Sequence, residues 1–168
     1  PKSYCRQTCR HCRRGLYHPA KSGHLAMRHP IHPALVHIPI ACWSLAVAAD
    51  FLSLHFGERA WQYSAALLLV GCIMAVVAML VGLIELAHVP EGPALRDTYL
   101  HMGAMLTAFT LFTLSLLTRL ENLQPISPDG LALTFDTFGF FSLMFGGWLG
   151  GKLVYGHGIG RGTKSRDD

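Results

Sequence analysis

Charged residues are scarce in this sequence, and long stretches of it contain almost none. Asp, Glu, Lys and Arg make up 14% of the 168 residues, whereas an average soluble domain contains about 25%. Between Ala34 and Leu54 the only ionisable side chains are His37, Asp50 and the thiol of Cys42. Apolar runs of about 20 residues are long enough to cross the hydrocarbon layer of a membrane as helices. The scarcity of charge therefore argues against a soluble globular protein.

Four such stretches predict four membrane-spanning helices. They are Ala34–Leu54, Tyr63–His88, Thr98–Thr118 and Leu131–Tyr155. In lipid the backbone must satisfy its own hydrogen bonds, which favours helices, and short connections favour antiparallel neighbours. We therefore expect an all-α membrane protein with an up-down bundle of four transmembrane helices in residues 32–160. A mostly irregular, basic tail that contains Cys and His is expected at 1–31, and a charged tail at 161–168.

The sequence also lacks a recognisable cleavable signal peptide and, beyond the hairpin pattern, an evident internal repeat. Pro30, Pro33 and Pro39 interrupt the approach to the first apolar run, which is too long for the core of a signal peptide. Pro39 has no N–H to donate to the carbonyl of Leu35, so we expect it to bend the first span near its start.

Positive charge is concentrated on one side of the expected membrane. We call the side where the chain enters the first span side A and the opposite side B. Of 14 Lys and Arg residues, only Arg59 and Arg119 fall on side B. Cytoplasmic loops carry an excess of such residues, so we expect both termini in the cytoplasm, in a bacterial inner membrane. Because the net charge of +4 follows this bias, we expect lipid rather than nucleic acid as the partner of the basic residues.

Histidines are gathered on side A. Five lie near the ends of the spans there: His32, His37, His88, His101 and His157. Polar rings at membrane depth usually face the protein interior, and histidine is a common axial ligand of haem iron. His37 and His101 each lie about one turn inside a helix, at comparable depth for a rise of about 1.5 Å per residue. We expect them to be the axial pair of a haem b, with His157 as the alternative ligand.

Other side chains near side A are candidates for contact with the same cofactor. Gly146/Gly150 and Gly147/Gly151 form two small-xxx-small pairs, which allow either a neighbouring helix or a flat macrocycle to approach closely.

The charged residues leave two roles open. In one role, Lys152 or Arg96 holds a haem propionate and Glu85 exchanges protons with a quinone. In the other, Lys152 and Glu85 form an ion pair with each other. Asp50 and Asp136, near side B, are expected to pair structurally with Arg59 and Arg119.

The cysteines of the tail do not form a recognisable metal motif. Cys5, Cys9 and Cys12 have the spacing that radical-SAM enzymes use, but no α/β barrel pattern follows them. Arg13 rather than His follows Cys12, which excludes a c-type haem attachment. A zinc site would need a further ligand pair of suitable spacing. We expect a basic tail that lies near anionic lipid.

Two motifs resemble the DUF2231 family of predicted membrane proteins. They are HPALVHIPIA at residues 32–41 and GGWLGGKLVYGHGIG at residues 146–160, and the similarity covers residues 29–160. The resemblance implies signature positions at His32, Pro33, His37, His101, Gly147, Gly150, Tyr155, His157 and Gly158. Some members are fused to Rieske iron–sulfur domains, which implies a redox setting. This chain has no Rieske ligand motif, so such a partner would be a separate protein.

These observations lead to one leading hypothesis and two alternatives. We expect an integral membrane redox subunit that binds haem b near side A and transfers electrons between quinone and a partner protein. Its cofactor-binding residues would be His37, His101, His157, Lys152, Arg96, Gly147, Gly150 and Tyr155. It would be an electron-transfer subunit of a larger membrane complex rather than a stand-alone enzyme. The alternatives are a non-redox anchor or assembly subunit, and a metal or proton transporter, against which the lack of charge at the membrane midplane counts.

Overall fold

Four long helices form the molecule in this computed structural model, which describes residues 31–86, 92–122 and 124–158. The helices are α1 (Ile31–Leu35), α2 (His37–Phe56), α3 (Glu58–Leu86), α4 (Pro93–Thr118) and α5 (Gly130–Tyr155). Strands β1 (Leu120–Glu121) and β2 (Gln124–Pro125) form a short antiparallel ribbon between α4 and α5. The predicted N-terminal tail, with its cysteines, the predicted C-terminal tail and His88 lie outside the described residues.

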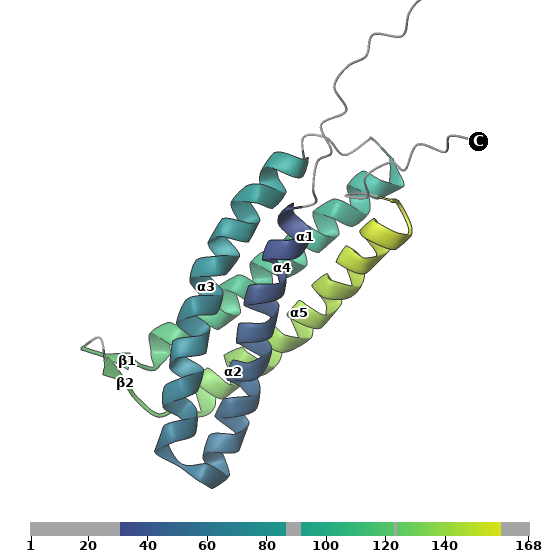
Figure 1. Cartoon of the computed structure of the whole chain (residues 1–168). Coiled ribbons are helices and arrows are strands. Elements are labelled where there is room, and N and C mark those ends of the chain that lie inside the picture. The colour runs from purple at the N-terminus through teal and green to yellow at the C-terminus, as the bar shows by residue number, and fades with distance from the viewer. Residues whose placement is uncertain (1–30, 87–91, 123, 159–168) are drawn as a thin grey trace, which may run out of the picture.

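The helices pack as two hairpins. The helices α2 and α3 contact each other extensively, as do α4 and α5, whereas contacts between the two hairpins are fewer. The start of α1 and the end of α5 lie at one end of the bundle, which is side A, and the α2–α3 turn lies at the other (Figure 1). The up-down arrangement expected from the apolar pattern is confirmed.

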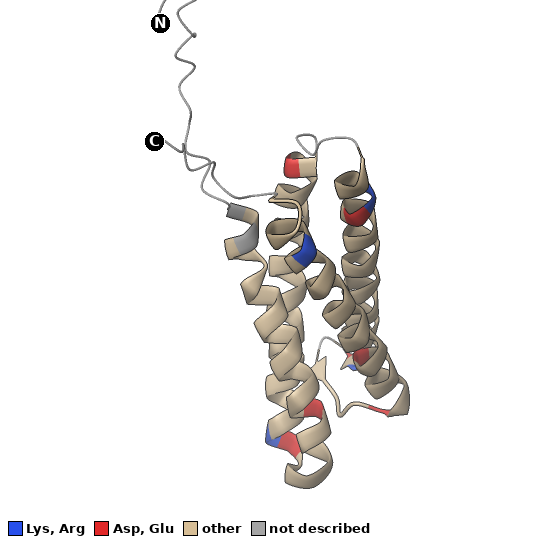
Figure 2. Cartoon of the chain, turned by 90° about the vertical axis from the view of Figure 1, so that its right-hand side faces the viewer, with Lys and Arg blue, Asp and Glu red and all other residues tan. Residues whose placement is uncertain are grey.

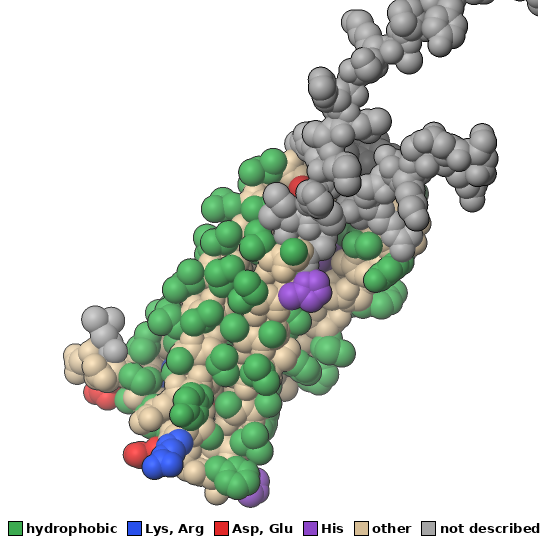
Figure 3. Space-filling model, in the orientation of Figure 1, with side chains coloured by type: hydrophobic (Ala, Val, Ile, Leu, Met, Phe, Trp, Pro, Cys, Tyr) green, Lys and Arg blue, Asp and Glu red, His purple; other side chains and the backbone are tan. Residues whose placement is uncertain are grey.

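The surface of the bundle matches a membrane interior. Helices α2, α3, α4 and α5 are each long and apolar enough to cross a membrane. Large apolar side chains such as Leu80, Phe141 and Trp148 are more than half exposed, and apolar side chains cover most of the face seen in Figure 3. Charged residues lie toward the two ends of the bundle and leave its middle uncharged (Figure 2). The protein is therefore an all-α integral membrane protein.

The first span is broken near its start, as Pro39 predicts. Val36 separates α1 from α2, at the point where the carbonyl of Leu35 would otherwise accept a bond from residue 39. The chain continues in the same direction because Val36 N donates to His32 O and Ile40 N donates to Val36 O.

The ends of the helices differ from the predicted loops. Helix α4 begins at Pro93, so Arg96 and Asp97 lie within it rather than in a loop. Gly57 alone joins α2 to α3, and its φ of 75° is a conformation that glycine adopts without strain. The spans predicted to begin at Tyr63 and Thr98 begin earlier in the structure, at Glu58 and Pro93, because charged residues at helix starts resemble loop residues.

An aromatic pair occupies the centre of the bundle. The rings of Trp43 on α2 and Phe112 on α4 stack with centroids 4.8 Å apart. Trp43 lies against Gly71 on α3, and Phe112 lies against Gly139 on α5. Each ring thus contacts a glycine of the other helix in its own hairpin. The core therefore crosses from one hairpin to the other through this pair.

Candidate functional site

Two histidines near side A, His32 on α1 and His101 on α4, are held in the same way. His32 Nδ1 lies 2.9 Å from the carbonyl oxygen of Ala78 on α3. His101 Nδ1 lies 2.8 Å from the carbonyl oxygen of Gly146 on α5. Each imidazole is therefore bonded to the second helix of its own hairpin.

A glycine one turn further along receives each ring. A Cβ placed on Gly82 would lie 2.8 Å from His32 Cε1, and one placed on Gly150 would lie 3.2 Å from His101 Cε1. Both positions are closer than ordinary van der Waals contact allows. The two glycines thus make room for the rings and fix where they lie.

These hydrogen bonds determine which ring nitrogen is available. A carbonyl oxygen can only accept, so Nδ1 of each ring must carry the hydrogen. In the neutral ring Nε2 then has a free lone pair, and this is the arrangement in which histidine binds a metal while a backbone carbonyl orients it. His32 and His101 are also close enough to interact electrostatically. Together they present two oriented donor atoms near side A.

The described residues contain no group of three or more His, Cys, Asp and Glu placed to hold a metal ion. Haem iron takes only its axial ligands from the protein. A pair of imidazoles is a donor set that fits this requirement. The close glycine contacts fit it as well, because they keep the rings oriented.

His37, the other histidine predicted as an axial ligand, has a different environment. It is the first residue of α2, and its side chain is exposed. The break at Val36 separates it from the turn that carries His32. The structure therefore brings His32, rather than His37, together with His101.

The remaining predicted site residues divide into two groups. Gly150 lies at the His101 ring, whereas Gly147 faces open space. Arg96 and Tyr155 have exposed side chains. Gly147 and Arg96 are thus not placed at the histidine pair in the described part of the chain.

Lys152 and His157 meet at Asp97, one helical turn from His101 toward side A. Lys152 Nζ lies 2.9 Å from Asp97 Oδ2, and His157 Nε2 lies 2.8 Å from the same oxygen. The predicted ion pair between Lys152 and Glu85 is wrong, because the ammonium group turns to α4 instead of α3. The Asp97 cluster links α4 to the end of α5.

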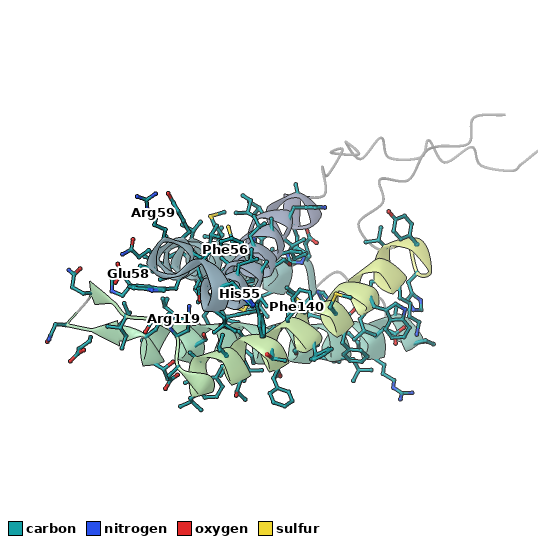
Figure 4. All side chains as sticks on the ribbon, turned by 90° about the horizontal axis from the view of Figure 1, so that it is seen from below. His55, Phe56, Glu58, Arg59, Arg119 and Phe140 are labelled. Carbon is teal, nitrogen blue, oxygen red and sulfur yellow. The ribbon has the colours of Figure 1, made fainter. Side chains whose placement is uncertain are left out.

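A second buried cluster lies toward side B around Arg119. Its guanidinium group contacts Asp50 of α2 and Asp136 of α5, each at 2.8 Å, and all three side chains are fully buried. Ser64 of α3 and Ser115 of α4 accept further hydrogen bonds. Figure 4 shows Arg119 between the helices and Arg59 at the outside of the bundle. The structural pairing expected for the two aspartates is thus made by Arg119 alone and joins all four helices.

The two clusters and the aromatic pair reveal an internal repeat that the sequence patterns had not indicated. His32 and His101, Trp43 and Phe112, and Asp50 and Arg119 are each 69 residues apart. On the second helix of each hairpin a spacing of 68 residues relates equivalent positions: Gly71 to Gly139, Ala78 to Gly146 and Gly82 to Gly150. Both hairpins start on side A, so this is a parallel repeat, with its axis along the membrane normal. Equivalent residues meet at the interface between the hairpins.

His32 was not among the cofactor ligands expected from the sequence, although the structure holds it in the same way as His101. Its signal lies in a shared spacing: His32 precedes Trp43 by the same number of residues as His101 precedes Phe112. That spacing becomes visible only when the two hairpins are aligned, since few other residues are identical between them.

Comparisons with known proteins give a family and no closer relative. A family model described as a predicted membrane protein (DUF2231) matches residues 28–163. No curated protein and no solved structure matches the chain.

Proposed function

The chain belongs to DUF2231, a family of predicted membrane proteins, and from this premise we propose that it is a membrane redox subunit that holds haem b between His32 and His101. The observation that carries the proposal is the matched placement of the two rings. Each Nδ1 donates to a carbonyl of the neighbouring helix, and each ring lies against a glycine. Both Nε2 atoms are then free to act as ligands.

The interface between the hairpins is where a flat group would enter. The hairpins contact each other less than their own helices do, and the two rings belong to different hairpins. A bound haem b would supply a one-electron centre whose potential depends on its axial ligands and on burial. The chain itself orients both imidazoles and surrounds them with apolar helices.

The Asp97 cluster provides charge at the edge of this site. Lys152 is 46% exposed at its side chain while it contacts Asp97, so its ammonium group is accessible from side A. We assign to Lys152 the role of holding a propionate, together with Arg96 in the first turns of α4. His157 is engaged by Asp97 and acts there rather than as an axial ligand.

The proposed partners and orientation follow from the distribution of charge. The topology predicted from the sequence assigns 12 of the 14 Lys and Arg residues to side A, and of the two on side B, Arg119 is fully buried. This bias favours side A as the cytoplasmic face of a bacterial inner membrane. Electrons would pass between a quinone in the lipid and a separate redox protein.

One observation favours a non-redox anchor subunit as the competing function. The histidine-to-carbonyl bonds join neighbouring helices, and such bonds stabilise membrane bundles without any cofactor. In that case His32 and His101 would serve packing alone.

Absorption spectra of purified, dithionite-reduced protein test the proposal. We expect the α-band of a bis-histidine haem b in the wild-type protein. His32→Ala and His101→Ala should each remove the band, because either change leaves haem iron with a single protein ligand.

His37→Ala is the matched control, since it removes a nearby but exposed imidazole. It should leave the spectrum unchanged. A wild-type protein expressed with ample haem that shows no band would favour the anchor role. A band lost in His37→Ala but retained in His32→Ala would assign the ligand to the other histidine.

A further inference from the structure

The Arg119 cluster contains more negative than positive charge. Arg119 contributes one positive charge, while Asp50 and Asp136 would contribute two negative charges if both were ionised. All three residues have zero exposed surface. The other ionisable groups toward side B have exposed side chains: His55, Glu58, Arg59, Glu121 and Asp129. Helix α3 contributes only the hydroxyl of Ser64 to the cluster. No described cation is therefore placed to balance the second carboxylate.

The hydrogen-bonding capacity of Arg119 is fully used. Nε donates to Ser115 O, Nη1 donates to the Asp50 carboxylate and Ser64 Oγ, and Nη2 donates to Ser115 Oγ and Asp136 Oδ2. A guanidinium group has five N–H bonds, and these contacts account for all of them. Arg119 has no donor left for another oxygen.

One carboxylate oxygen is left without a partner. Asp136 Oδ1 is buried and receives no hydrogen bond. The carboxyl group of Asp50 is the acidic neighbour that interacts with Asp136. A buried acceptor without a donor is costly, and an uncompensated buried charge costs more. Both costs are removed by a single proton.

We propose that Asp50 and Asp136 together bind one proton, which makes the buried cluster a proton-binding site near side B. The proton gives the cluster a net charge of zero and supplies the missing donor between the two carboxyl groups. Because the two carboxyl groups share one site, the proton belongs to both of them. The site lies at the opposite end of the bundle from His32 and His101, and it exists whether or not a haem is bound.

The proton also contributes to the packing of the bundle. The cluster is built by Asp50, Ser64, Arg119 and Asp136, which come from four different helices. Without the proton, the two carboxylates would repel each other and push α2 away from α5.

Infrared spectroscopy of the purified full-length protein tests the proposal. A protonated carboxyl group has a C=O stretch that is separate from the carboxylate bands and shifts in D₂O. We expect such a band in the wild-type protein at neutral pH. Asp50→Asn and Asp136→Asn should each abolish it, since the single carboxylate that remains is neutralised by Arg119. Asp129→Asn, which changes an exposed aspartate, should leave it unchanged.

Three results would overturn the proposal: no band in the wild-type protein, a band that persists in either cluster variant, or a band that is lost in Asp129→Asn. If a variant does not fold, isotope labelling of the wild-type protein decides the question. Aspartate isotope-labelled in its side-chain carboxyl group must shift the band, and a band that does not shift would exclude Asp50 and Asp136 as its source.

Discussion

Arg119 has an environment that its place in the sequence does not suggest. It follows the last residue of α4, where a cation would ordinarily face water. Its side chain instead turns inward and contacts Asp50, Ser64 and Asp136 from three other helices. The carbonyl of Arg119 accepts from Ile126 N, so the ribbon of β1 and β2 is anchored at the same residue. A single side chain therefore ties together the side B end of the bundle.

Replacing this residue should be strongly destabilising. Arg119→Gln removes the cation from two buried carboxyl groups, and loss of one partner of a buried ion pair costs about 3–5 kcal/mol. We expect a corresponding loss in unfolding free energy, measured by denaturation in detergent micelles. Arg59→Gln removes an exposed cation of the same side and should change the stability by less than about 0.5 kcal/mol. Equal effects of the two changes would contradict the assigned role.

At the scale of elements, α5 carries two glycine faces with different surroundings. Gly146 and Gly150 lie against Met105 and His101 of α4, whereas Gly147 and Gly151 face open space. Both pairs match a small-xxx-small pattern, but only the first mediates helix packing. The equivalent face of α3 contains Gly82, which lies against His32.

This difference predicts that alanine is tolerated at one glycine of α5 and not at its neighbour. Gly150→Ala would place a methyl group against the His101 ring, and such overpacking typically costs about 1–3 kcal/mol. We expect lower stability and, if haem binds, weaker retention of it during purification. Gly147→Ala should have little effect on either measurement. Gly82→Ala should reproduce the effect of Gly150→Ala through His32, and a Gly82→Ala protein with wild-type properties would argue against equivalent sites.

At the scale of the whole molecule, two hairpins of the same direction form the bundle. Each enters from side A, returns to side A and contributes one histidine and one central aromatic ring. The start of α1 and the end of α5 therefore lie at the same end of the bundle. The first hairpin adds Asp50 and the second adds Arg119 and Asp136 to the buried charged cluster.

The orientation can be measured with reporter fusions. An alkaline phosphatase fused after Gly57, on side B, should be active because side B faces away from the cytoplasm under the positive-inside rule. The same enzyme fused after Asp168 should be inactive, whereas a fluorescent protein at that end should fluoresce. The reverse pattern would place side A outside and would contradict the proposed orientation.

Individual residues show which features were predictable. Pro39 marked the break in the first span because the loss of an N–H is a local property of the backbone. Asp50 and Asp136 were recognised as paired groups because charge inside a membrane must find a partner. The partner of Lys152 was missed, since Asp97 and Glu85 are at similar depth and only helix packing selects between them. The bond of His32 to Ala78 on α3 was not predicted, since it joins segments 46 residues apart.

The sequence by itself determined that the chain spans a membrane as four antiparallel helices, because apolar length and charge are local quantities that set the cost of leaving water. It also predicted that His32, His101 and His157 lie toward one side, since each span reverses the chain direction. Only the tertiary structure decided which residues meet: Trp43 with Phe112, and Arg119 with two aspartates. Those contacts depend on how two hairpins rotate and pack against each other, which is a relation between distant segments and not a property of any one of them.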